Sequence, residues 1–173
     1  MRIFSPGWFV VYTKPRHERR VTCALQKAGI DNFLPLTRKL RIWSDRKKYV
    51  EEPLFPSYVF IKLEDLQGYF TSLDIDSILY FVRTGNQIAK VNEVIITNLK
   101  ILIAKAADNI EVTSDRIPAG SKLTIKEGVF TGFCCEVVEY KGKEIFAVRI
   151  ELLQRNILID VPAEQLMSVT NVY

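Results

Sequence analysis

Leu54-Phe55-Pro56-Ser57-Tyr58-Val59-Phe60-Ile61, residues 54–61, is the stretch that decides the fold. Its apolar, aromatic and β-branched composition predicts a central strand, and Pro56 suits the start or edge of a strand. Tyr58 and Phe60 are two positions apart, so both side chains point to the same face of the sheet. An antiparallel sheet can bury one face and offer the other to a partner. Partner binding and ordinary core packing are both consistent with these aromatic side chains.

The segments before this strand predict a second strand and a helix. Residues 8–12, Trp-Phe-Val-Val-Tyr, are aromatic and β-branched, which is typical of a buried strand. Lys14-Pro15 is expected to open a helix, with Pro15 at its first position. An apolar stripe at intervals of three and four residues fits one helix face: Val21, Ala24, Leu25 and Ala28. Gly29 is a natural helix stop, and residues 33–36 are expected to be extended.

Residues 38–50 predict an exposed β-hairpin with a dense positive charge. Charged and apolar residues partly alternate on both sides of Ser44-Asp45, so we place the turn near Asp45. Six cations lie within eleven residues: Arg38, Lys39, Arg41, Arg46, Lys47 and Lys48. Such groups bind phosphates in a salt-dependent, largely sequence-independent way, and Trp43 offers a ring for stacking on a base. The alternative is a solvated hairpin in which Trp43 covers the core.

The remaining segments predict the rest of an α+β domain and a smaller β domain. Residues 78–83 predict a strand and residues 92–106 a helix, so residues 1–106 form a mixed or antiparallel sheet with two or three helices. Residues 107–116 are polar and aperiodic, which is typical of a linker. Residues 117–173 contain strand-like runs at 123–125, 135–140, 145–150 and 157–161. Five short strands over this length predict a small β-barrel.

Charge is distributed unevenly along the chain. Residues 1–52 hold 12 Lys and Arg against 5 Asp and Glu, a net charge of +7, whereas residues 53–173 hold 12 against 15, a net charge of −3. This asymmetry indicates that the first part faces nucleic acid and is joined to something else. A solvated basic surface without a ligand is the alternative.

Enzymatic and metal-binding functions find little support in the sequence. His17 is the single histidine and has no paired carboxylate and nucleophile, so we expect a surface or capping residue. Cys23, Cys134 and Cys135 show no CxxC spacing. We therefore expect no catalytic residue, no metal and no cofactor. The start of the chain lacks the apolar region of a signal peptide, and no apolar run approaches the ~18 residues of a membrane span, so we expect a cytoplasmic protein.

Five segments, in order along the chain, resemble the NusG family of transcription factors. Residues 8–13 resemble the opening strand of its N-terminal domain, and residues 52–60 resemble the central strand in the Pro-Leu-Phe-Pro form of the RfaH and UpxY specialists. Residues 80–85 resemble the later Phe-Val-Arg segment, and residues 43–48 are similar to UpxY-type antiterminators. Residues 125–133 resemble the start of a KOW motif, although Cys135 stands where that motif usually has a second glycine.

The resemblance implies a monomeric, non-enzymatic elongation or antitermination factor with an N-terminal domain and a KOW barrel. It implies that RNA polymerase clamp helices bind a hydrophobic depression, whose matching residues are Tyr12, Phe55, Pro56, Tyr58, Phe60, Phe81 and Leu99. It also implies that DNA at the upstream fork or the displaced non-template strand contacts the hairpin. A second basic set around the first helix extends this surface: Lys14, Arg16, Arg19 and Arg20.

The resemblance further implies that the barrel recruits another factor, such as the messenger-channel ribosomal protein or Rho. In RfaH the same segment also folds as a helical hairpin, but the β-branched residues of 137–138, 145–150 and 157–159 favour a barrel here. The specialist-like motifs favour an operon-specific antiterminator. The alternatives are a general NusG-type factor and a KOW-containing protein that binds RNA or the ribosome.

Overall fold

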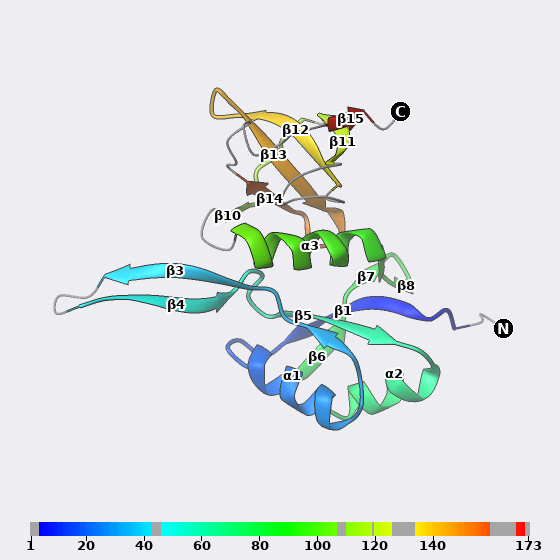
Figure 1. The fold of residues 1–173 in the computed structure, drawn as a ribbon. Helices are drawn as coiled ribbons and strands as arrows, with labels where there is room; N and C mark the ends of the chain where they lie inside the picture. Colours follow the sequence, from blue (N-terminus) through cyan, green and yellow to red (C-terminus); the bar gives the residue numbers. More distant parts are fainter. Residues whose placement is uncertain are drawn as a thin grey trace. The chain divides into compact units, whose positions relative to one another are not determined.

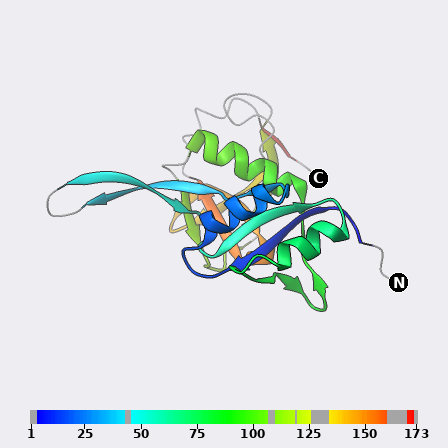
Figure 2. The same ribbon diagram turned by 90° about the horizontal axis from the view of Figure 1, so that it is seen from below.

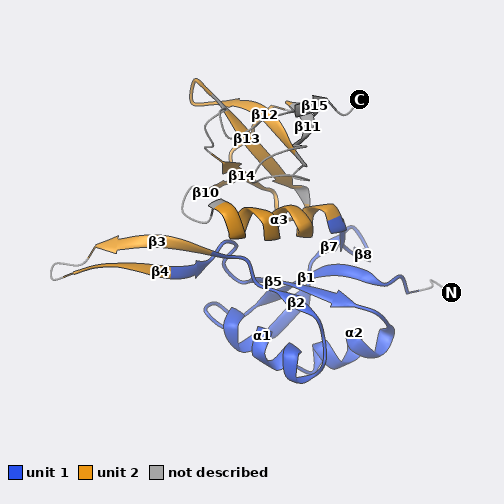
Figure 3. Ribbon diagram, in the orientation of Figure 1, with its two compact units in different colours: residues 1–36, 51–93 blue, residues 37–50, 94–173 orange. Residues whose placement is uncertain are grey.

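The computed structural model describes residues 4–42, 46–106, 110–118, 120–125, 134–159 and 169–171. The chain divides into two units, coloured separately in Figure 3. The first unit comprises residues 1–36 and 51–93, and the second comprises residues 37–50 and 94–173. Each unit is described by itself.

An antiparallel sheet of order β2-β5-β1-β6 forms the first unit, and β9 also pairs with β1. The strands are β1 (Gly7–Thr13), β2 (Asn32–Phe33), β5 (Tyr58–Leu63), β6 (Ile78–Phe81) and β9 (Lys90–Val91). Two short strands, β7 (Arg83–Thr84) and β8 (Gln87–Ile88), form a separate ladder. Helices α1 (Glu18–Lys27) and α2 (Leu66–Leu73) lie on the same face of the sheet, as Figures 1 and 2 show. The strands expected at residues 8–12, 54–61 and 78–83 are therefore confirmed, and β5 is an inner strand.

The core of the first unit lies between the two helices and one face of the sheet. Alternate residues of β1 and β5 point into it, among them Phe9, Val11, Val59 and Ile61. Two members of the predicted apolar helix stripe, Val21 and Leu25, are fully buried against them: each has 0% exposure. Burying an aliphatic side chain of this size stabilises the fold by about 1.5–3 kcal/mol.

Helix α1 begins later than the sequence indicated. Pro15 was expected at its first position, but the helix starts at Glu18. The reason is the backbone of Arg16, whose φ of 64° is left-handed and incompatible with a helix start. The predicted stop is confirmed, because Gly29 has a φ of 72°. There the Gly29 amide donates to the Gln26 carbonyl at 3.0 Å and the Ile30 amide to the Leu25 carbonyl at 2.9 Å, a Schellman cap.

Strand β5 also starts later, and one helix was not predicted. Ser57 has a φ of 67°, so the extended strand begins at Tyr58 rather than at Leu54. Helix α2 follows Asp65, whose carboxylate accepts a hydrogen bond from the Gly68 amide at 2.8 Å and so caps the helix. A glycine in the first turn of so short a helix weakens the helical pattern in the sequence.

The expected hairpin is present as β3 (Leu36–Ile42) paired with β4 (Lys47–Pro53). We call this pair the basic ribbon; it is the long two-stranded element in Figure 1. Where the ribbon meets the first unit, the two chain segments are joined by a hydrogen bond. The Leu54 amide donates it to the Pro35 carbonyl at 2.8 Å. The turn predicted near Asp45 lies outside the described residues.

The second unit contains α3 (Glu93–Ala106), which confirms the helix expected at 92–106, and an antiparallel sheet of order β10-β14-β13-β12-β11-β15. Its strands are β10 (Ile110–Thr113), β11 (Ser121–Ile125), β12 (Cys134–Tyr140), β13 (Lys143–Ile150), β14 (Arg155–Ile159) and β15 (Val169–Asn171), with the 3-10 helix η1 at Glu151–Leu153. The fold class predicted from the sequence, α+β with a second β domain, is therefore confirmed. In the described part of the chain β10 and β15 do not pair, so closure into a barrel stays a prediction.

One part of this unit differs from the sequence interpretation. Residues 107–116 were expected to be a linker, yet Ile110–Thr113 form β10 and pair with β14 from Ile110↔Ile159 to Thr113↔Asn156. Four residues were too few to show an alternating pattern. The KOW-like residues 126–133 lie outside the described residues. Cys135 is buried in β12, opposite Leu123 of β11.

Candidate functional site

Three tyrosines form a row across three neighbouring strands on the sheet face opposite the two helices. Tyr12 of β1 lies opposite Tyr58 of β5 and Tyr80 of β6 in the strand register. The Tyr12 and Tyr80 rings stack with centroids 5.0 Å apart, and the Tyr12 and Tyr58 rings meet edge to face at 5.1 Å. Both geometries are favourable for aromatic pairs. We call these residues the tyrosine row.

The outer end of the tyrosine row faces solvent. Tyr80 is 52% exposed, whereas Tyr12 and Tyr58 are half-buried. Tyr80 was not among the site residues named from the sequence. The neighbouring Phe81 was named, but Phe81 lies opposite Val11 and therefore points to the helix-covered core, where its ring centroid is 4.9 Å from that of Tyr69. The only available signal was strand parity: in a strand, Tyr80 and Phe81 must face opposite ways.

The phenylalanines of the predicted site are buried in this structure. Phe60 has 0% exposure and Phe55 2%, and their rings meet edge to face with centroids 6.2 Å apart. Phe60 shares the sheet face of the tyrosine row, because it pairs with Val10, two residues before Tyr12. Pro56 is exposed. Leu99, on α3, is fully buried and belongs to the second unit.

A buried carboxylate fixes the turn that leads into Tyr58. Glu18, in the first turn of α1, is 5% exposed, and its Oε1 atom accepts a hydrogen bond from the Ser57 amide at 2.7 Å. The Ser57 carbonyl in turn accepts from the Thr13 amide at 2.8 Å. Together these bonds hold Ser57 in its left-handed conformation and join it to both α1 and the end of β1. They thereby set the position of Tyr58 next to Tyr12.

The cations of the basic ribbon all lie at the surface. The exposed residues are Arg38, Lys39, Arg41, Arg46, Lys47 and Lys48. Between them stand exposed apolar side chains, with Leu40 at 47%, Ile42 at 67% and Tyr49 at 61% exposure. Successive strand residues point to opposite sides, so Lys39 and Arg41 share one side of β3 and Leu40 and Ile42 the other. Trp43 lies outside the described residues.

The second basic set is partly neutralised. The Lys14 ammonium is 3.2 Å from the Asp76 carboxylate, and the Arg19 guanidinium is 3.3 Å from the Glu51 carboxylate. Arg16 and Arg20 are exposed and make no ion pair with a described residue. His17 precedes α1 at its N-cap position, where its Nδ1 atom lies 3.1 Å from the Ser77 hydroxyl. The second basic set is therefore partly used in ion pairs, whereas the basic ribbon presents a dense group of exposed cations.

Two negative findings apply to the described part of the chain. It contains no group of three or more histidine, cysteine, aspartate or glutamate side chains placed to hold a metal ion. None of its helices has the length and apolar character needed to cross a membrane.

A family model matches more than half of this chain. The family described as transcription termination factor NusG matches residues 6–100. The transcription termination/antitermination protein NusG of Lactococcus lactis subsp. lactis (strain IL1403) is 20% identical over 176 residues, which cover 96% of this chain and 95% of that protein. Among solved structures, NusG of Thermotoga maritima is 19% identical with a TM-score of 0.46, covering 90% of this chain and 93% of that one. The MjSpt4:Spt5 complex is 15% identical with a TM-score of 0.31, covering 95% and 97%.

We predict that Glu18→Ala destabilises the protein by about 1–3 kcal/mol, because the Ser57 amide loses its partner and remains buried. Urea unfolding of the full chain measures the change in free energy. Glu64→Ala is the matched control, since Glu64 is exposed and its ion pair in the described part of the chain is with Lys62, so its loss is expected to cost less than about 0.5 kcal/mol. Equal effects of the two substitutions would show that the buried bond is not stabilising.

Proposed function

Since this chain belongs to the NusG family of transcription termination and antitermination factors, we propose that it binds RNA polymerase through the tyrosine row and bubble DNA through the basic ribbon. Polymerase contact is assigned to the clamp helices, as the family resemblance implies. The observation that carries the proposal is the tyrosine row itself, with Tyr80 half exposed at its end.

The tyrosine row has the properties of a protein-binding surface. Tyrosine offers a large apolar ring and a polar hydroxyl, and it is enriched at the energetic centres of interfaces. The stacked and edge-to-face contacts around Tyr12 restrict the rings before any partner arrives. Less conformational entropy is then lost on binding. Pro56, which is exposed, precedes Tyr58 by two residues.

The other expected contact residues take different roles in the proposal. Phe55 and Phe60 are buried in this structure, so the proposal assigns them packing contacts next to the tyrosine row rather than direct contact with a partner. Phe81 stabilises the helix-covered core. Leu99 is fully buried on α3, and direct contact is not assigned to it.

The basic ribbon supplies the complementary electrostatic contact. Its exposed cations match the phosphate backbone of DNA, and such contacts position a protein without reading sequence. Exposed Tyr49 and Ile42 offer apolar area beside these charges. An upstream fork or a displaced non-template strand presents both phosphates and unstacked bases to such a surface.

The proposed mechanism is binding, not catalysis. A protein that contacts the clamp and the bubble DNA together favours the polymerase conformation in which both contacts exist. The shift in the equilibrium equals the difference in binding free energy between that state and the paused state. Simultaneous contact at two sites also raises affinity, because the second contact forms intramolecularly.

We predict that Tyr80→Ala weakens binding to core RNA polymerase by at least about tenfold, as expected for an interface residue worth more than 1.4 kcal/mol. Biolayer interferometry with immobilised polymerase measures the affinity. Phe70→Ala is the matched control: Phe70 is an aromatic side chain of similar exposure, 56%, but on α2, which covers the opposite face of the sheet. If Tyr80→Ala and Tyr58→Ala both bind like the unmodified protein, the tyrosine row is not the polymerase site.

We predict that replacing Arg46, Lys47 and Lys48 together by glutamine weakens binding to a DNA bubble and flattens its salt dependence. Each lost phosphate contact lowers the slope of log K against log salt by roughly 0.7–0.9. Fluorescence anisotropy at several salt concentrations gives this slope. Replacing Lys27, Lys105 and Lys143 by glutamine removes the same charge outside the ribbon and is expected to leave the slope unchanged. An unaltered slope in the ribbon variant would remove the assignment.

The specialist-like motifs of residues 43–48 and 52–60 further support an operon-specific antiterminator within this family. Transcript profiling of a deletion strain tests this point, and we predict changes confined to one or a few long operons. A genome-wide effect would indicate a general factor instead. The second unit is proposed to recruit a further factor, such as the ribosome or Rho, as the family resemblance implies.

A further inference from the structure

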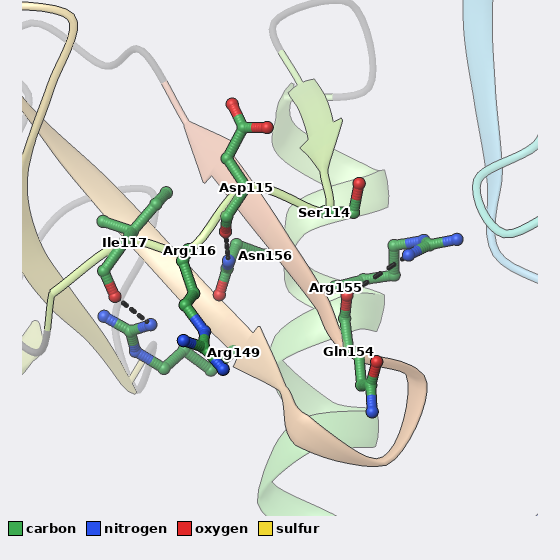
Figure 4. A pocket seen from close by; sticks show the side chains of 8 residues that line it. All are labelled: Ser114, Asp115, Arg116, Ile117, Arg149, Gln154, Arg155 and Asn156. Atoms are coloured by element: carbon green, nitrogen blue, oxygen red, sulfur yellow. Dashed lines mark hydrogen bonds between the residues drawn. The ribbon is translucent and has the colours of Figure 1, made fainter.

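The second unit contains an open hollow of about 450 Å³ that the proposed function does not use. It lies between the segment that follows β10, the turn before β14 and the end of β13, as Figure 4 shows. The lining residues are Ser114, Asp115, Arg116, Ile117, Arg149, Gln154, Arg155 and Asn156. Three of these eight side chains are arginines, and one is a carboxylate.

The walls of the hollow are fixed by hydrogen bonds within the second unit. Arg149 donates from Nη1 to the Ile117 carbonyl at 2.8 Å and from Nη2 to the Pro118 carbonyl at 2.5 Å. Its Nε atom pairs with the Glu136 carboxylate at 2.8 Å, and both of these side chains are largely buried. The Asn156 amide donates to the Asp115 carbonyl at 2.9 Å. Residues 115–118, on one side of the hollow, are therefore held to β13 and β14 by hydrogen bonds that need no ligand.

The two remaining arginines are available to a ligand. Arg116 is exposed and makes no hydrogen bond or ion pair with a described residue. The Arg155 guanidinium has one hydrogen bond in the described part of the chain, a 3.3 Å contact with the carbonyl of its neighbour Gln154. In Figure 4 the Arg116 side chain extends towards Arg149, and the Arg155 side chain extends in the opposite direction, away from Arg116.

The nearby carboxylates are engaged elsewhere. Figure 4 shows the Asp115 side chain directed away from Arg116. It accepts a 2.7 Å hydrogen bond from the Tyr140 hydroxyl. This bond, together with one involving Thr113, lowers the pKa of Asp115 below its usual value. Glu136 is committed to Arg149. The lowered pKa keeps Asp115 ionised, so the hollow is lined by one carboxylate and by two arginines, Arg116 and Arg155, that have no ion pair with a described residue. The local balance is therefore positive, although residues 53–173 as a whole carry a net negative charge.

We propose that this hollow binds a phosphate group, carried either by a single-stranded nucleic acid or by free phosphate. The planar guanidinium group matches the geometry of phosphate oxygens and can donate two parallel hydrogen bonds. Ser114 and Gln154 add neutral donors. The volume falls within the range of small-molecule sites, about 300–1,000 Å³, so it accommodates a phosphate together with an attached sugar or base. The site does not depend on the polymerase contact.

The test uses the full-length chain labelled with nitrogen-15, in which Arg46, Lys47 and Lys48 are replaced by glutamine so that ribbon binding does not interfere. Inorganic phosphate and a single-stranded uridine pentanucleotide are titrated separately. We expect saturable shifts of the backbone amide signals of Ser114, Asp115, Gln154 and Asn156. Additional Arg116→Gln and Arg155→Gln replacements are expected to weaken binding at least tenfold.

Lys143→Gln is the matched control, because Lys143 is an exposed cation of the same unit outside the hollow. It is expected to leave both affinities unchanged. Tighter binding of the oligonucleotide than of phosphate assigns the site to nucleic acid, and equal or exclusive binding of phosphate assigns it to the free anion. Absence of shifts with both probes, or equal weakening by Lys143→Gln, overturns the proposal. Dispersed spectra of each variant confirm that it is folded.

Discussion

The hydrogen bond between the Glu18 carboxylate and the Ser57 amide is the contact on which the first unit depends. A non-glycine residue in the left-handed region costs roughly 1–2 kcal/mol, so Ser57 needs a compensating interaction. A charge-assisted bond to a buried carboxylate is strong enough to supply it. Because the same turn joins β1 through Thr13, it sets the register in which Tyr12 meets Tyr58. A slip of one residue would move the tyrosine to the helix-covered face.

Much of the first unit was predictable from local patterns, and the exceptions have physical causes. The runs around Phe9 and Val59 are strongly β-forming, and the spacing of Val21 and Leu25 fits a buried helix face. By contrast, Ile78–Phe81 is hydrophobic or aromatic at every position, so the sequence does not show which side chains share a face until the pairing with β1 is known. That is why Phe81 was chosen and Tyr80 was missed. The role of Glu18 was equally hidden, because a glutamate in a first helical turn ordinarily faces solvent.

The distribution of charge along the sequence predicted a binding surface only for a whole segment, and not for individual residues. The excess of cations in residues 1–52 indicated a nucleic-acid-facing part, and the structure concentrates the exposed cations on one ribbon while Lys14 and Arg19 are paired. Residues 53–173 carry a net negative charge, but the hollow in the second unit is locally positive. There Glu136 is paired with Arg149, and Asp115 accepts a hydrogen bond from Tyr140 but keeps its charge, so Arg116 and Arg155 outnumber the one remaining carboxylate. Charge counting cannot reveal such a site, because it depends on which partners the fold brings together.

The basic ribbon has a consequence beyond any ligand. In the described part of the chain β3 and β4 pair only with each other, so each strand presents an unpaired backbone edge to solvent. Two-stranded ribbons with exposed apolar residues such as Ile42 and Tyr49 are prone to pair edge to edge with another copy. Like-charged lysines and arginines along both strands make that pairing repulsive. The same residues that would attract a polyanion therefore also protect the free protein from aggregation.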